Sequence, residues 1–265
     1  MSGDALTPLE SQLQRVLMRD RLWIGAGLAL VLLLSWGWVV PAALDMRGDM
    51  RGLAAWMMAP AHDARYAALL LAMWFVMMTA MMVPSAAPTL LLYGRVVRSQ
   101  PGSGTSVRQV YAFGIGYLLA WLGFSVAATA LQLLLGRASM LTPMMHIGER
   151  TAAASLLVLA GAYQWMPLKR GCLAHCRSPA GYIARHWLPG VSGAVRMGIR
   201  HGIHCLGCCW ALMLLLFVGG VMSLGWIAAL TLLVLVEKLA PSGDRFGRIL
   251  GLLLAGSGAV LLWGG

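Results

Sequence analysis

Sulfur and imidazole side chains are concentrated in one stretch of the chain. All five cysteines lie in two segments, GCLAHCRSP (171–179) and HGIHCLGCCWALMLLLF (201–217). Thiolate and imidazole bind zinc, copper(I) and iron–sulfur clusters, whereas magnesium and calcium prefer oxygen ligands. An odd number of clustered cysteines is untypical of a disulfide framework and favours metal or thiol chemistry. The candidate metal ligands in these segments are Cys172, His175, Cys176, His201, Cys205, Cys208 and Cys209.

The spacing within each segment matches one face of a helix. Cys172, His175 and Cys176 stand at i, i+3 and i+4, which are neighbouring positions on a helical surface. The remaining four ligands stand at i, i+4, i+7 and i+8, and His204 lies one position off their face. Neither group alone offers enough converging ligands for a closed tetrahedral site, so we expect the two groups to come together. The alternatives are that the cysteines pack a core or shuttle electrons as thiols.

A methionine-rich segment, MWFVMMTAMMVPS (73–85), offers a second kind of soft ligand. Its methionines recur at i, i+4 spacing, so thioethers are stacked along one side of a helix. Thioether sulfur favours copper(I) over hard ions. The alternative is that this stripe only fills gaps in apolar packing, as methionine often does. The candidate ligands of the stripe are Met77, Met78, Met81 and Met82.

More candidate ligands are expected on the opposite side of the membrane from the cysteines. They are Asp45, Met46, Asp49, Met50, Met57, Met58, His62, Asp63, Met140, Met144, Met145, His146 and Glu149. Outer Met, His and Asp, a thioether stripe and an inner Cys/His group form the order of ligands that a copper(I) path would use. Glu237 ends an apolar run beside Lys238. We expect Glu237 to be a metal ligand, a proton acceptor or the partner of Lys238.

The composition indicates which elements position these ligands. Apolar residues make up 60% of the 265-residue chain and charged residues 11%, against about 25% charged residues in soluble domains. Apolar runs long enough to cross a hydrocarbon core of about 30 Å must form helices, because lipid offers no hydrogen bonds. The sequence therefore predicts an all-α, polytopic helical membrane protein. Seven spans are expected, at 22–41, 66–84, 111–135, 151–166, 207–223, 226–239 and 248–263. Because two of these are short, the alternative is six spans and a re-entrant hairpin.

The distribution of Lys and Arg predicts the orientation. Most of these residues fall in segments that seven spans would leave on the same side as the N-terminus, so the N-terminus is expected to be cytoplasmic. Residues 1–21 then form a cytoplasmic segment, without a cleavable signal peptide. Residues 22–265 form a single transmembrane metal-binding domain with a cytoplasmic Cys/His loop at about 167–209. The net charge of +11 is explained by these inner loops, so no nucleic-acid partner is expected. Pro84 and Pro88 are expected to break or end the second span.

Three separated segments carry a family resemblance. AMWFVMMTAMMVPSAAP, PLKRGCLAHCRSP and HGIHCLGCCWALMLLLF, with the later EKL, resemble a bacterial family of unknown function whose members are labelled predicted metal-binding integral membrane proteins. The resemblance runs from about residue 55 to the C-terminus. It implies a multi-span inner-membrane protein with a Cys/His metal site, and no particular reaction or metal. The matching positions are the four stripe methionines, Pro84, the seven Cys/His candidates and Glu237.

Two classes of function follow from these ligands. The first is an inner-membrane protein that binds a soft transition metal, with copper favoured over zinc or iron, in handling, transfer or transport. The alternative is a membrane metallo-oxidoreductase that uses the Cys/His centre for electron transfer or oxygen chemistry. A third hypothesis is a thiol oxidoreductase with shuttling cysteines. The expected partners are the lipid bilayer and a metallochaperone or another membrane subunit.

Overall fold

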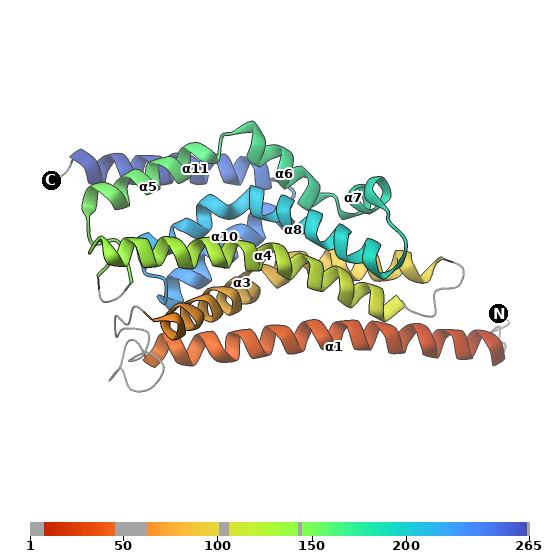
Figure 1. The fold of residues 1–265 in the computed structure, drawn as a ribbon. Helices are drawn as coiled ribbons and strands as arrows, with labels where there is room; N and C mark the ends of the chain where they lie inside the picture. The colour runs from red at the N-terminus through yellow and green to blue at the C-terminus, as the bar shows by residue number, and fades with distance from the viewer. Residues whose placement is uncertain (1–7, 46–62, 101–105, 143–144, 264–265) are drawn as a thin grey trace.

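The computed structural model describes residues 8–45, 63–100, 106–142 and 145–263, and all structural statements refer to these. Helices dominate, which confirms the all-α prediction. In chain order they are α1 (Pro8–Asp45), α3 (Ala64–Arg98), α4 (Ser106–Arg137), α5 (Arg150–Tyr163), α6 (Pro167–Arg177), α7 (Pro179–His186), α8 (Gly190–Leu214), α9 (Leu216–Gly219), α10 (Leu224–Leu239) and α11 (Gly243–Trp263). Helix α1 lies along one edge of the bundle, and α5 and α11 lie along the opposite edge (Figure 1).

Fewer helices reach membrane length than the sequence predicts. By length and composition, five are long and apolar enough to cross a membrane: Leu22–Asp45, Ala64–Arg98, Val107–Arg137, Gly190–Gly219 and Gly243–Trp263. The expected spans 151–166 and 226–239 fall in α5 and α10, which have 14 and 16 residues. At about 1.5 Å per residue, such helices are shorter than a core of about 30 Å. The expected count of seven full spans, or six, is therefore too high for the described helices.

The outer helices present apolar side chains outwards. Leu33 in α1 is 72% exposed, and Val260 in α11 is 71% exposed. The most buried of the membrane-length helices are α3 and α8. Large exposed apolar surfaces on a folded chain mark contact with a membrane or another protein. Apolar residues on the outside of the bundle and polar residues within it are therefore consistent with a membrane protein.

Helix α3 continues through both of its prolines, so the expected break at Pro84 and Pro88 is wrong. A proline lacks the N–H that would bond the carbonyl four residues earlier. For Pro84 that carbonyl belongs to Ala80, and it accepts a hydrogen bond of 3.2 Å from Nε1 of Trp36 in α1. A neighbouring helix thus satisfies the freed carbonyl, which removes one reason for the helix to end.

Helices α4 and α8 pack with their backbones in close contact. A Cβ atom on Gly198 would lie 2.0 Å from the carbonyl oxygen of Phe113, and one on Gly116 would lie 2.2 Å from that of Val195. Both distances are far below any real Cβ contact, so only glycine fits at these two positions. This approach fixes the position of α8, which carries most of the candidate cysteines about two to three turns after Gly198.

The segment expected as a loop at 167–209 is mostly helical. It contains α6, α7 and the first part of α8. Pro167 and Pro179 each stand in the first turn of their helix, where a missing N–H has no intrahelical partner to lose. Gly190 begins α8 with a φ of 77°, a left-handed conformation that favours glycine. The cysteines therefore stand on helices with fixed directions.

We predict that Gly198→Ala lowers the stability of the protein. The added methyl group must push α4 and α8 apart, and overpacking of this kind costs about 1–3 kcal/mol. Gly123→Ala in α4 is the matched control, because Gly123 is exposed and has no atom within 4 Å of the new Cβ. The control is expected to be neutral or to stabilise by up to about 1 kcal/mol, since alanine is the better helix former. Thermal unfolding in detergent micelles measures both changes. Equal stability of the two variants would contradict the close contact.

Candidate metal centre

The structure brings the two Cys/His segments together. Helix α6 packs against α8, and the Cys176 thiol hydrogen-bonds to the sulfurs of Cys205 and Cys208. Cys209 is in similar contact with these two residues, and the three thiols of α8 are each only 1% exposed. We call Cys176, Cys205, Cys208 and Cys209 the thiol cluster. All four are free thiols. The expectation that the two groups come together therefore agrees with this geometry.

Hydrogen bonding affects the chemistry of Cys176. Its contacts with the sulfurs of Cys205 and Cys208, together with burial, raise the pKa of the Cys176 thiol well above its ordinary value. These contacts and burial thus favour the protonated form of Cys176 over its thiolate.

Cys172 lies at the edge of the cluster, on the same face of α6. Its sulfur is 2.6 Å from the point where a Cβ on Gly207 would stand, so glycine at this position lets α6 approach α8. Burial raises the pKa of the Cys172 thiol, with a smaller contribution from Cys208. Cys172 is partly exposed, unlike the buried cysteines of α8.

The methionine stripe reaches the thiol cluster at one end. Met82 Sδ lies 3.9 Å from Cys209 Sγ. The side chains of Met77, Met78 and Met81 are fully buried along the same helix. In the described part of the chain, these three have no hydrogen bond to a thiol. The stripe is thus continuous with the cluster, although only its last member contacts it.

A hydrogen-bonded chain stands at the other end of the stripe. Trp74 Nε1 donates to Gln132 Oε1 over 2.6 Å, and Gln132 Nε2 donates to Met145 Sδ over 3.3 Å. Met145 was expected among the outer ligands. His146 bonds Thr142 Oγ1 through Nδ1 over 2.9 Å. The candidates at 46–62 and Met144 lie outside the described residues.

Two polar side chains from other helices contact the sulfur of Cys205. Lys238 Nζ in α10 lies 2.9 Å from this sulfur, and the Tyr117 hydroxyl in α4 lies 3.1 Å from it. The Tyr117 hydroxyl also donates to the carbonyl oxygen of Met82 over 3.2 Å. Sequence reasoning singled out neither residue as part of the site, because Lys238 looked like a cation at a helix end and Tyr117 like a core aromatic.

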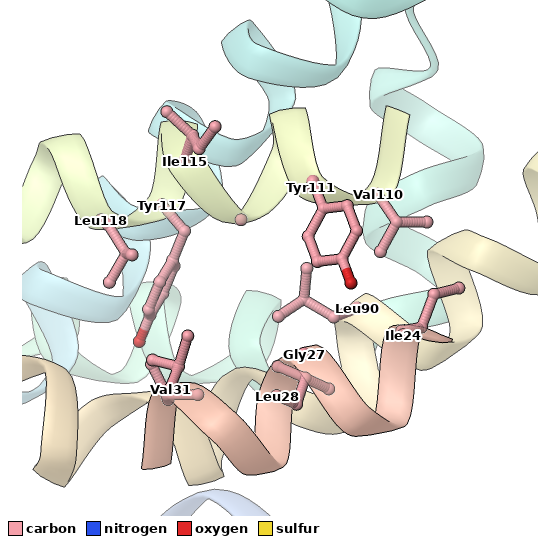
Figure 2. A pocket seen from close by; sticks show the side chains of 12 residues that line it. Ile24, Gly27, Leu28, Val31, Leu90, Val110, Tyr111, Ile115, Tyr117 and Leu118 are labelled. Carbon is pink, nitrogen blue, oxygen red and sulfur yellow. The ribbon is translucent and has the colours of Figure 1, made fainter. Parts of the chain in front are cut away.

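Tyr117 separates the thiol cluster from an apolar cavity. The cavity lies mainly between α1 and α4, and Figure 2 shows Leu28 and Val31 of α1 lining it together with Tyr117 and Leu118 of α4. Its lining is almost entirely apolar. Because the Tyr117 ring faces this cavity while its hydroxyl contacts Cys205, the residue shields the sulfurs on that side.

His201 has an unused nitrogen within the bundle. The side chain is 3% exposed, and its Nδ1 atom has no hydrogen-bond partner. The imidazole is surrounded by the rings of Phe113, Tyr117 and Tyr182, with centroid distances of 5.9, 5.8 and 5.2 Å. A buried polar atom without a partner is costly, and a metal ion is one way to satisfy it. His201 stands one turn before Cys205 on α8.

His175 is placed differently from the expectation. Its ring stacks on that of His204 with centroids 4.4 Å apart, and its Nδ1 contacts the carbonyl oxygen of Gly171 over 2.8 Å. His186 of α7 is 6.2 Å from His175 by ring centroids. His175 therefore belongs to a partly exposed histidine group together with His204, which the sequence pattern had set apart.

Glu237 has a buried partner other than Lys238. Lys169 Nζ of α6 lies 2.8 and 2.7 Å from the two carboxylate oxygens of Glu237, and it also bonds Gln164. Glu237 is 1% exposed and Lys169 is 2% exposed. This ion pair joins α6 to α10 at the level of the cluster. The carboxylate of Glu237 thus bonds Lys169, and the three roles expected for Glu237 stay predictions.

The donor set suits a soft ion in a low coordination number. Within the residues described, no group of three His, Cys, Asp or Glu side chains is already arranged to hold a metal ion. The cluster instead offers neighbouring thiols, a thioether and an unused imidazole nitrogen. Soft sulfur donors of this kind select copper(I) over hard ions.

Comparison with known proteins adds a family to this geometry. A family model described as PpoB2, copper chaperone, matches residues 71–261, a range that includes the thiol cluster, the methionine stripe and Lys238. No curated protein and no solved structure matches the chain. The description names copper, so zinc and iron gain no support from it. Because the match covers well over half of the 265 residues, the chain belongs to the PpoB2 family of copper chaperones.

Proposed function

We propose that the protein is a multi-pass protein of the bacterial inner membrane that binds copper(I) at the thiol cluster and passes it on. The observation that carries this proposal is the convergence of α6 and α8, which gathers four thiols beside the thioether of Met82. Five apolar helices of membrane length support the membrane location. The cytoplasmic N-terminus was inferred from seven spans, and it stays a prediction.

Each group of the cluster has a distinct task in this proposal. Cys205 and Cys208 bind the ion as thiolates, and Cys176, Met82 and His201 are the nearby donors that complete or exchange its coordination. Tyr117 and the apolar cavity lining exclude water from the buried side. Cys172, His175 and Cys176 of α6 are partly exposed, so they are the first of the Cys and His ligands that an incoming ion meets.

Binding is coupled to proton release. A thiol must lose its proton to bind a metal, so protons compete with copper and the affinity falls as the pH is lowered. The raised pKa of the Cys176 thiol strengthens this competition at Cys176. Because Cys176 stands on α6 and the other thiols of the cluster stand on α8, we assign it to the transfer of the ion.

The buried ion pair of Lys169 and Glu237 holds the cluster together from outside. It joins α6, which carries Cys176, to α10, which carries Lys238. Glu237 is thus proposed to position the helices and not to bind copper. Removal of one partner of a buried ion pair leaves an uncompensated charge and typically costs about 3–5 kcal/mol.

The buried methionine stripe supports a role for this protein in moving copper(I) through the helix bundle. Its methionines extend from Met73, beside Trp74 and its link to Met145, to Met82 at the cluster. Thioethers bind copper(I) more weakly than thiolates and without proton release, which suits an ion in transit. The chemistry of the stripe therefore complements that of the thiols.

The thiol assignment predicts a clear difference between cysteine variants. Purified wild-type protein in detergent should bind silver(I), a redox-stable soft monovalent ion, at a ratio near one per chain. Cys205→Ser with Cys208→Ser should reduce binding at least about tenfold, because the hydroxyls do not replace thiolates. Elemental analysis after gel filtration and competition with a sulfur chelator measure both.

Cys172→Ser is the matched control for that experiment, since Cys172 lies at the edge of the cluster and outside its hydrogen bonds. It should retain most of the binding. Wild-type affinity in the double variant would overturn the assignment. A loss in Cys172→Ser as large as in the double variant would show that the site is centred on α6 instead of α8.

A second prediction separates coordination from packing in the stripe. Replacing methionine with leucine conserves volume, so the loss of stability should stay below about 1.5 kcal/mol per site. Met82→Leu should weaken silver(I) binding measurably, because Met82 is in contact with Cys209. Met77→Leu with Met81→Leu should leave binding at the cluster unchanged and slow copper delivery in cells. If the second variant supports wild-type copper-dependent growth, the stripe is packing and the path through it fails.

A further inference from the structure

Lys238 is a buried cation at the thiol cluster. Its side chain is 5% exposed, and it reaches from α10 to Cys205 Sγ over 2.9 Å and to Ser85 Oγ over 3.1 Å. Ser85 belongs to α3 and bonds the carbonyl oxygen of Met82. The ammonium group therefore lies between the helix that carries the cysteines and the helix that carries the methionine stripe.

The acidic group in hydrogen-bond contact with Lys238 is the thiol of Cys205. The carboxylate of the adjacent Glu237 bonds Lys169. In the part of the chain that the structure describes, the acidic groups that interact with the charge of Lys238 are the Tyr117 hydroxyl, the Glu237 carboxylate and the thiols of Cys176, Cys205, Cys208 and Cys209. A charge buried away from water needs an opposite charge beside it. Of these groups, Cys205 lies 2.9 Å from the ammonium group, and its sulfur carries a negative charge when it binds a metal ion.

We propose that Lys238 makes the cluster selective for a monovalent metal ion. This inference rests on the proposed function, and it names the charge of the ion that the site accepts. Two thiolates carry two negative charges and Lys238 carries one positive charge. A monovalent ion bound by these two thiolates brings the total to zero, whereas a divalent ion bound by the same two leaves a net positive charge in a low-dielectric region, where uncompensated charge is strongly unfavourable. Copper(I) is thus balanced by two thiolates, whereas zinc(II) must remove a further proton from Cys176 or Cys209 to reach the same balance.

The positive charge of Lys238 adds a second basis for metal selection to that of the soft sulfur ligands. Sulfur ligands alone accept zinc(II) as well as copper(I), so they do not separate the two ions. A fixed cation within reach of the same thiolates adds a repulsion that grows with the charge of the bound ion. Lys238 is therefore a specificity-determining residue that acts through charge and need not itself bind the metal.

The test is a comparison of a monovalent and a divalent soft ion in the purified full chain in detergent. Silver(I) and cadmium(II) are titrated in competition with chelators of known affinity, and the ratio of their affinities is the readout. Lys238→Met removes the charge and keeps the length of the side chain. It should lower the preference for silver(I) over cadmium(II) about tenfold or more, in the range of buried charge pairs.

Three variants complete the design. Lys238→Gln is a second neutral variant, and its amide can still bond Ser85. With two neutral variants, the test remains possible if one of them does not fold. Lys238→Arg keeps the charge and should keep the preference close to that of the wild type. Arg196→Gln removes an exposed cation of α8, where water screens the charge, and should leave the ratio unchanged.

The outcomes are distinguishable. A wild-type protein that binds silver(I), with an unchanged ratio in both neutral variants, would refute the role of Lys238 and leave the thiol site intact. A wild-type protein whose cysteines bind neither ion would refute the proposed function and this inference together. The inference would be supported if the ratio of silver(I) to cadmium(II) affinity falls in both neutral variants and remains at the wild-type value in Lys238→Arg.

Discussion

Helix α8 approaches α4 and α6 so closely that glycine is required at the points of contact. Gly198 lets α8 contact the backbone of α4, and Gly207 leaves room for the sulfur of Cys172 on α6. A helix held at this distance on both sides has little freedom to rotate or slide. The thiols of α8 therefore face Cys176 from one side and Met82 from the other, and the cluster is a consequence of the backbone packing.

Each of the two buried lysines of the bundle contacts a side chain on a different helix. Lys169 of α6 meets Glu237 of α10, and Lys238 of α10 meets Cys205 of α8. Glu237 and Lys238 are neighbours in sequence, yet they serve different partners on different helices. Because a lone buried charge is so unfavourable, each pair also sets the relative position of its two helices. The chemistry of the site and the stability of its surroundings are thus linked through α10.

Much of the architecture could be predicted from the sequence, because apolar runs in lipid have no alternative to the helix. The convergence of the Cys/His groups was also predictable, since each group alone has too few ligands. The roles of Tyr117 and Lys238 could not be predicted. Each residue contacts Cys205, which is 88 residues away from Tyr117 and 33 residues away from Lys238, and nothing in the surrounding apolar sequence indicates such a partner. The continuity of α3 through Pro84 depends on Trp36, a contact between two helices that local propensity does not contain. The stacking of His175 on His204 likewise depends on how α6 crosses α8.

We propose that copper is held by sulfur at the junction of α6 and α8. X-ray absorption at the copper edge of the copper-loaded wild-type protein identifies both the oxidation state and the ligand atoms. We expect copper(I) whose ligand atoms are mainly sulfur, and loss of these sulfur ligands when Cys205 and Cys208 are replaced by serine. A first shell of nitrogen and oxygen, or a sulfur shell that survives the two replacements, would contradict it.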